Sequence, residues 1–303
     1  MGDTVKVTRR KSRLKQPTIG DWIIVGVMIL LILSCILPVL TVVARSFSDP
    51  GAIMRQEVVF VPVGFHVDAY ADILNDGRFM RSLGWTAILT VMFTLLALFM
   101  TVLAAYPLTY DQLKGRKIIT LLIIFTMYFH AGTIPMFLLY QRLGILNTPS
   151  VLILPGLISV FLMIIMRKFF LGIPESLKES AEIDGASPFT ILIKIYLPLS
   201  TPALATLGLM YAVGRWNGFA DALMFLTGPG TDVYHPIQLL LFQILQGQVG
   251  IDTTLDPGVA AAPGRIETVR SAAIVVAMVP ILCVYPWLQK YFVSGVTLGA
   301  VKG

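Results

Sequence analysis

Apolar and polar segments alternate along the whole chain. The first apolar segment covers residues 22–44 and is long enough to cross a hydrocarbon core of about 30 Å, which needs roughly 20 helical residues. Further apolar segments of similar length cover residues 83–106, 118–140, 150–166, 201–223 and 271–288. The pattern therefore predicts an all-α integral membrane protein with six transmembrane helices and with both ends on one side of the membrane.

Proline marks two of these segments. Pro107 follows the second segment and is expected to end its helix. Pro135 lies inside the third segment, where it removes a backbone hydrogen bond that protein or cavity water must replace. We therefore expect the break near residues 132–135 to face the interior of the helix bundle.

Two polar segments predict structure outside the spans. Residues 45–80 are expected to form a small subdomain, with a possible short strand at residues 58–61. Residues 227–270 form a long loop rich in Gly and Pro, and within it residues 236–246 have the pattern of an amphipathic helix. This helix is too short to span, so it either lies at the membrane surface or simply packs against the bundle.

Composition supports a membrane location. Of the 303 residues, 56% are hydrophobic and only 13% are charged, with a mean hydropathy of +0.81, which is too apolar for a soluble globular domain. The formal net charge of +6 could indicate binding of nucleic acid, but the basic residues flank apolar segments, as in membrane proteins. Cys35 and Cys283 both lie inside apolar segments, so no disulfide framework is expected.

The basic residues also predict the orientation. Residues 1–21, 107–117, 167–198 and 289–303 together hold 15 of the 23 Lys and Arg residues. The positive-inside rule therefore places both tails and the segment 167–198 in the cytoplasm, and residues 45–80 and 227–270 on the other side. A signal peptide that ends at Ala44 is the alternative for the first segment, but the segment is longer than a signal sequence needs.

One charged segment, residues 174–198, separates the fourth and fifth spans. Pro174 fits the first position of a helix, and Gly185 fits the left-handed residue that follows a helix C-terminus. Ser187 and Pro188 fit the N-cap and first position of a second helix. The segment predicts two short helices around a glycine elbow, although a solvated loop with helix caps explains the pattern equally well.

The spacing within this segment resembles the EAA motif of ABC importer permeases. The motif is Glu179-Ser180-Ala181, three residues, Gly185, nine residues, then Ile195-Tyr196-Leu197-Pro198, with Ser180 where Ala is usual. The resemblance implies that the segment is a coupling helix that lies in a groove of a separate ATPase subunit. The residues that it assigns to this contact are Glu179, Ser180, Ala181, Glu182, Asp184, Gly185, Ile195, Leu197 and Pro198.

The resemblance extends over most of the chain and is closest to the lipoprotein-dependent oligosaccharide permeases of bacteria, relatives of the six-span maltose permease subunit. The similar stretches are Tyr106-Pro107, residues 144–148 and 182–186, Trp216-Asn217, and residues 290–293 and 299–303. This implies the type I ABC importer permease fold, with residues 81–288 as the permease core. It also implies a bacterial plasma membrane protein that moves an oligosaccharide by ATP-driven alternating access.

The partners implied are a second, non-identical permease subunit, two ATPase subunits and an extracytoplasmic solute-binding protein. The chain has no G-x-x-x-x-G-K-[ST] sequence, so we expect ATP and Mg to be bound by the ATPase subunits and this chain to be neither an enzyme nor a cofactor carrier. His66, His130 and His235 show no metal-ligand spacing, so no metal site is expected.

Polar residues near the outer end of the fifth span are candidates for the substrate path or a partner contact, because polar groups within a membrane are costly. They are Arg215, Trp216, Asn217 and Asp221. A position at the outer interface explains them equally well. Arg215 and Asp221 are six residues apart, which puts them on different faces of a helix, so we do not expect them to pair. Gln243 is a candidate for contact with sugar hydroxyls or the binding protein.

Two other classes of transporter are the alternatives. An ion-coupled secondary transporter or a channel would need carboxylates within the membrane or an inverted repeat, and the sequence shows neither. An ABC permease of the same architecture for an amino acid, a polyamine or a phosphonate differs only in its cargo, so the coupling segment does not distinguish it.

Overall fold

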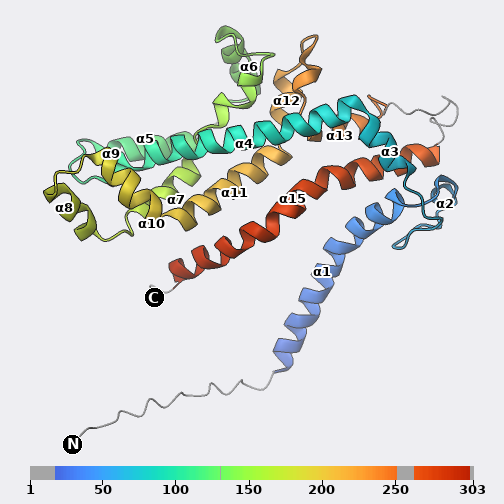
Figure 1. Ribbon diagram of the computed structural model, residues 1–303, viewed down its shortest axis with the longest axis horizontal. Coiled ribbons are helices and arrows are strands. Elements are labelled where there is room, and N and C mark those ends of the chain that lie inside the picture. Colours follow the sequence, from blue (N-terminus) through green and yellow to red (C-terminus); the bar gives the residue numbers. More distant parts are fainter. Residues whose placement is uncertain (1–17, 130, 251–262, 301–303) are drawn as a thin grey trace, which may run out of the picture.

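The computed structural model describes residues 18–129, 131–250 and 263–300, with side chains up to residue 284 (Figure 1). Within these ranges the chain forms helices and turns, and no strand occurs. Three helices are long and apolar enough to cross a membrane, and three bent helix pairs raise this to as many as six. The long helices are α1 (Ile19–Ser46), α4 (Gly77–Ala105) and α15 (Pro263–Ala300).

The bent pairs correspond to the third, fourth and fifth predicted spans. The first pair is α5 (Arg116–Tyr128) with α6 (Thr133–Arg142), and the second is η2 (Pro149–Leu152) and η3 (Leu154–Gly156) with α7 (Val160–Phe170). The third joins α9 (Pro188–Ile191), the π-helical turn η4 (Leu192–Tyr196) and α10 (Leu197–Leu199) to α11 (Thr201–Asn217) through a bend of 81°.

Shorter helices lie between and beyond these spans. They are α2 (Pro50–Met54), α3 (Asp68–Asn75), η1 (Pro107–Thr109), α8 (Glu175–Ile183), α12 (Ala220–Phe225), η5 (Thr231–Tyr234) and α13 (Ile237–Leu245). Helix α4 ends at Ala105, close to Pro107, as the sequence predicted. Helices α11 and α15 differ from the prediction, since α11 already ends at Asn217 and α15 begins eight residues before Ser271.

Helix α4 is the centre of the bundle. It packs against α7, α11 and α13, and α11 packs in turn against α15 (Figure 1). Three groups of buried side chains lie along α4, around Ala97 near one end, Leu89 in the middle and Phe79 at its start. Helix α13 contributes to the last group through Ile237, which is fully buried. The amphipathic helix predicted at residues 236–246 therefore packs against the bundle, the plainer of the two expectations.

Two local predictions are wrong. The break at residues 131–135 is exposed, with Ile134 75% exposed, so it does not face the interior of this chain's bundle. Pro135 lies in the first turn of α6, where a backbone N–H has no partner within the helix. The proline therefore removes no helical hydrogen bond, and the break needs no replacement partner from the bundle interior. Residues 59–61 form bends instead of a strand, and Val58 is buried in a small cluster with Ala44 of α1 and Ala52 of α2.

A compact cap closes the end of the bundle at which α4 begins. Helices α2 and α3 pack there against the start of α15, and Asp72 forms a buried ion pair with Arg265. Gly264 permits α15 to lie this close to α2, since a Cβ atom at that position would lie 2.2 Å from the carbonyl oxygen of Pro50. The hydroxyl of Tyr70 lies 2.7 Å from Ser46 Oγ, and burial raises the Tyr70 pKa above its usual value. The cap holds α1, α3 and α15 together at one end.

Candidate functional site

A cavity of about 560 Å³ lies between α4, α7, α11 and α12. Aromatic rings and polar groups share its wall, and the cavity is open to the surface of the chain. Three of the predicted path residues, Arg215, Asn217 and Asp221, line it. The other side chains that define its chemistry are Phe93, Ser159, Tyr211 and Phe219.

Arg215 and Asp221 form a two-pronged ion pair, with Nη1 to Oδ2 at 2.6 Å and Nη2 to Oδ1 at 3.0 Å. The prediction that they would not pair is wrong because it assumed one continuous helix. Helix α11 ends at Asn217, the chain turns at Gly218, and Asp221 lies on the separate helix α12. The turn brings the carboxylate back over the end of α11.

The Arg215 side chain is only 7% exposed and has further partners in the backbone. Nη1 donates to the carbonyl of Leu152 at 3.0 Å, and Nη2 donates to the carbonyl of Gly218 at 3.2 Å. Arg215 therefore joins α11, α12 and η2. Asp221 neutralises the charge of Arg215, and two carbonyls accept from its Nη1 and Nη2, while its Nε is buried without a partner among the described residues. Arg215 therefore shapes the cavity as part of a neutral pair.

A second set of bonds crosses the cavity wall through hydroxyl groups. The hydroxyl of Tyr211 lies 2.7 Å from Thr101 Oγ1 and accepts a hydrogen bond from the backbone N–H of Ser159 at 3.2 Å. The ring of Phe93 packs edge-on against Tyr211, with centroids 6.1 Å apart. No sequence pattern indicated these contacts, because hydroxyl residues are common in apolar helices and Thr101 and Tyr211 are 110 positions apart.

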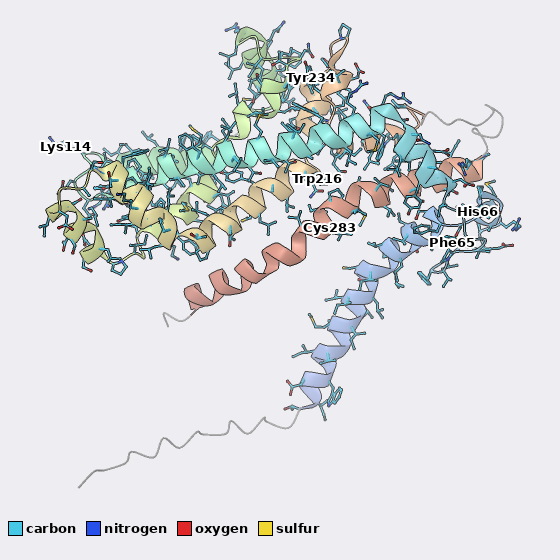
Figure 2. All side chains as sticks on the ribbon, in the orientation of Figure 1. Phe65, His66, Lys114, Trp216, Tyr234 and Cys283 are labelled. Carbon is cyan, nitrogen blue, oxygen red and sulfur yellow. The ribbon has the colours of Figure 1, made fainter. Side chains whose placement is uncertain are left out.

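Trp216 and Gln243 lie outside this cavity. The Trp216 side chain faces α15, where its Nε1 donates to the carbonyl of Ala277 at 3.3 Å (Figure 2). It lines a separate apolar pocket of about 310 Å³. Gln243 lies on α13 and borders two smaller polar pockets. Of the five predicted path residues, the structure thus brings three together and separates the other two.

The segment 174–198 folds as the predicted pair of helices around Gly185, which has a φ of +77°. Pro174 is the N-cap of α8, one position before the predicted one. Ser187 caps α9, since its hydroxyl accepts from the backbone N–H of Thr190 at 3.2 Å. We call residues 174–199 the elbow.

The elbow exposes large apolar side chains beside its glycine. Ile183 is 86% exposed and Phe189 is 62% exposed, and Gly185 lies between them in open space. Of the residues that the EAA resemblance assigns to the contact, Ala181, Ile195 and Leu197 are half-buried and pack on the chain's own core. The exposed ones are Glu179, Ser180, Glu182, Asp184, Gly185 and Pro198. Sequence reasoning missed Ile183 and Phe189, although their place beside the motif glycine is a usable signal.

Tyrosine side chains join the elbow to the end of α4. The hydroxyl of Tyr106 lies 2.6 Å from that of Tyr110 and donates to the carbonyl of Pro188 at 2.9 Å. The ring of Tyr196 packs edge-on against Tyr106, with centroids 5.1 Å apart. Lys178 of α8 lies 4.1 Å above the ring centroid of Tyr110. Both elbow helices therefore contact the segment that follows α4.

Among the described residues, no group of three or more His, Cys, Asp or Glu side chains is arranged to hold a metal ion. His66 lies in the segment before α3 and His235 directly follows η5, while His130 lies outside the described residues. Cys35 on α1 and Cys283 on α15 are free and exposed. The chemistry available at the cavity is therefore that of hydrogen bonds, aromatic faces and one neutralised ion pair.

Comparisons with known proteins give the family. Residues 77–298 match the family described as "Binding-protein-dependent transport system inner membrane component". The chain is 39% identical over 283 residues to the polygalacturonan/rhamnogalacturonan transport system permease protein YtcP of Bacillus subtilis (strain 168), with 93% of this chain and 98% of that protein covered. It is 26% identical over 294 residues to the arabinooligosaccharides transport system permease protein AraQ of Halalkalibacterium halodurans, with 95% and 99% covered.

A solved structure confirms the predicted type I ABC importer permease fold. It is the crystal structure of a bacterial ABC transporter involved in the import of the acidic polysaccharide alginate. A chain of that transporter matches with a TM-score of 0.79 and 33% sequence identity, over 91% of this chain and 98% of that one. Sequence and fold agree, so this chain belongs to the family of inner membrane components of binding-protein-dependent transport systems.

Proposed function

We propose that the chain is the transmembrane permease subunit of a bacterial ABC importer and moves an oligosaccharide across the plasma membrane by ATP-driven alternating access. One helix carries this proposal. Helix α4 contributes Phe93 and Thr101 to the cavity and its hydroxyl contacts, and Tyr106 just after it is bonded to the elbow. A movement of the elbow therefore reaches the cavity through a single rigid element.

The exposed apolar surface of the elbow supports an ATPase subunit as its partner. Ile183 and Phe189 are large, exposed hydrophobic side chains. They lie in the segment that the Lys and Arg distribution assigns to the cytoplasmic side of the membrane. Docking on a partner would remove both from water. The remaining partners in the proposal are a second, non-identical permease that closes the open cavity, another ATPase subunit and an extracytoplasmic binding protein. ATP and Mg then belong to the ATPase subunits, and this chain is not an enzyme.

The cavity wall supports a sugar as cargo. The half-buried ring of Phe219 provides a face for the C–H groups of a sugar ring, and Ser159 and Asn217 provide hydrogen-bonding groups. Two of the similar proteins are named for polygalacturonan/rhamnogalacturonan and for the acidic polysaccharide alginate. We therefore take oligosaccharides that carry carboxylates as the cargo class.

Co-purification and a matched pair of glycine variants test the proposal. Gly185 and Gly115 both have a φ of +77° and open space around the Cα, so alanine strains the backbone equally at each, by about 1–2 kcal/mol. Only Gly185 lies in the elbow. We expect Gly185→Ala to lower ATP-dependent uptake into proteoliposomes several-fold, and Gly115→Ala to leave it near the wild-type rate.

Two results would contradict the proposal. One is a detergent-solubilised chain that brings no ATPase subunit with it under conditions in which the complex transports. The other is uptake that stops when ion gradients are dissipated while ATP is maintained, because an ABC importer uses ATP directly and a secondary transporter does not.

A further inference from the structure

A polar pocket of about 250 Å³ lies near the start of α4, between that helix, η5 and α13. A second pocket of about 320 Å³ adjoins it and shares Asp232, His235 and Gln243 in its lining, with Thr231 further along. Both lie apart from the cavity between α7 and α11. The polar side chains of the first pocket are Arg78, Arg81, Ser82, Asp232, His235 and Gln243.

The charges in the first pocket are not all neutralised. Arg78 is engaged, since its Nη2 donates to the carbonyl of Gly250 at 2.8 Å and lies 3.4 Å from Asp76 Oδ2. Arg81 is exposed and has no hydrogen bond or ion pair with any residue in the described part of the chain. This is the reverse of Arg215, whose charge is neutralised by Asp221. A guanidinium group able to receive an anion therefore lines the outer pocket and not the central cavity.

We propose that the outer pocket is a binding site for a carboxylated sugar, in which Arg81 pairs with the sugar carboxylate and Asp232 and Gln243 bind sugar hydroxyls. The proposal rests on the proposed function and names the residues that would recognise its cargo class. A guanidinium binds a carboxylate through two parallel hydrogen bonds. Asp232 is exposed and, among the described side chains, is without an ion-pair partner, so it provides an acceptor for hydroxyl groups.

An acidic side chain of the binding protein is the competing occupant, and the pocket fits it less well. An ionised Asp or Glu side chain has only acceptors, so the Asp232 carboxylate would repel it. A sugar acid has hydroxyl donors as well as a carboxylate, and it meets Arg81 and Asp232 with complementary groups. The adjoining pocket, lined by Thr231 and Gln243, also gives room for a neighbouring sugar unit.

The experiment uses the whole importer in proteoliposomes, with ATP inside and the binding protein saturated with trigalacturonate. We expect Arg81→Gln to lower uptake roughly fivefold, the effect of losing one partly exposed charge-assisted pair. Arg81→Lys keeps the charge but loses the planar guanidinium group, so its uptake should lie between that of Arg81→Gln and that of the wild type. The control is Arg142→Gln, because Arg142 is also exposed and without a described partner but lies on α6, away from both pockets.

The methyl ester of the trimer distinguishes the carboxylate from the rest of the sugar. Its uptake should be equal for Arg81→Gln and wild type, because the ester has no charge for Arg81 to pair with. Equal losses for acid and ester, wild-type uptake of the acid by Arg81→Gln, or weaker docking of the ligand-free binding protein by this variant would each overturn the site. A wild-type importer that takes up no oligosaccharide would instead refute the proposed function.

Discussion

The two ends of α4 are held by different chemistry. At its start, the cap depends on the buried ion pair between Asp72 and Arg265. At its end, Tyr106 meets the elbow through neutral hydroxyl and ring contacts. Breaking a buried ion pair costs about 3–5 kcal/mol, whereas one neutral hydrogen bond is worth about 1 kcal/mol. The cap end is therefore suited to stay fixed, and the elbow end is suited to change its contacts at low cost.

The largest effect is expected in the cap. Asp72→Asn leaves Arg265 charged and buried without its partner, so the unfolding free energy should fall by about 3–5 kcal/mol. Thermal unfolding of the detergent-solubilised importer measures it. The double variant Asp72→Leu with Arg265→Met should recover most of this loss, because no lone charge remains. Glu57→Gln is the control: its pair with Arg55 lies at 2.8 Å in the same cap but is exposed, so the midpoint should not move.

An intermediate effect is expected at the central cavity. Arg215→Met removes the pair with Asp221 and the links to Leu152 and Gly218, but Asp221 is 31% exposed and water can still reach it. We expect a loss of about 2–3 kcal/mol together with reduced uptake. Asn217→Ala nearby removes only a bond to the Val213 carbonyl within its own helix and should change stability little. If Arg215→Met and Asn217→Ala lose the same amount of unfolding free energy, Arg215 does not have the positioning role assigned to it.

The smallest effect on stability is expected at Tyr106, where the effect on the coupling of ATP turnover to uptake should be clearest. Tyr106→Phe keeps the ring and removes the bonds to Tyr110 and the Pro188 carbonyl, which together cost about 1–2 kcal/mol. We expect ATP turnover to continue while fewer molecules of cargo are taken up per ATP. Tyr128→Phe is the control, because Tyr128 is 75% exposed. If Tyr106→Phe keeps the wild-type ratio of uptake to ATP turnover, the Tyr106 contacts do not couple the elbow to transport, and the contrast drawn between the two ends of α4 is wrong.

Much of the architecture could be predicted because membrane spans and helix ends have strong local signals. Apolar length indicated the helices that are long enough to cross a membrane, Pro107 marked the end of α4, and the pair of helices around Gly185 formed as its caps indicated. Helix ends and apolar spans depend on the backbone preferences and hydrophobicity of neighbouring residues, so they can be predicted from a short stretch of sequence.

The cavity was harder to predict because its contacts join positions that are distant or lie across a turn. The Arg215–Asp221 pair depends on the break after Asn217, and Asn217-Gly218 is itself a turn signal that a continuous-helix reading overlooks. The direction in which Trp216 points was not predictable, since either face of α11 could have met α15. The contact between Tyr211 and Thr101 depends on how two helices cross, and no short sequence pattern indicates it.

The π-helical turn at Leu192–Tyr196 has a consequence for the length of the elbow. It holds one residue more than an α-helical turn, and one residue corresponds to a rotation of about 100° about the helix axis. Removing any one of these residues would restore an ordinary helix but turn Gly185 and Ile183 away from their present direction. The exposed positions Ile193 and Lys194 should accept other side chains, while no deletion here should be tolerated. The number of residues between Gly185 and Ile195, which is nine, thus determines the direction in which Gly185 and Ile183 face, whereas the residue types within this stretch matter less.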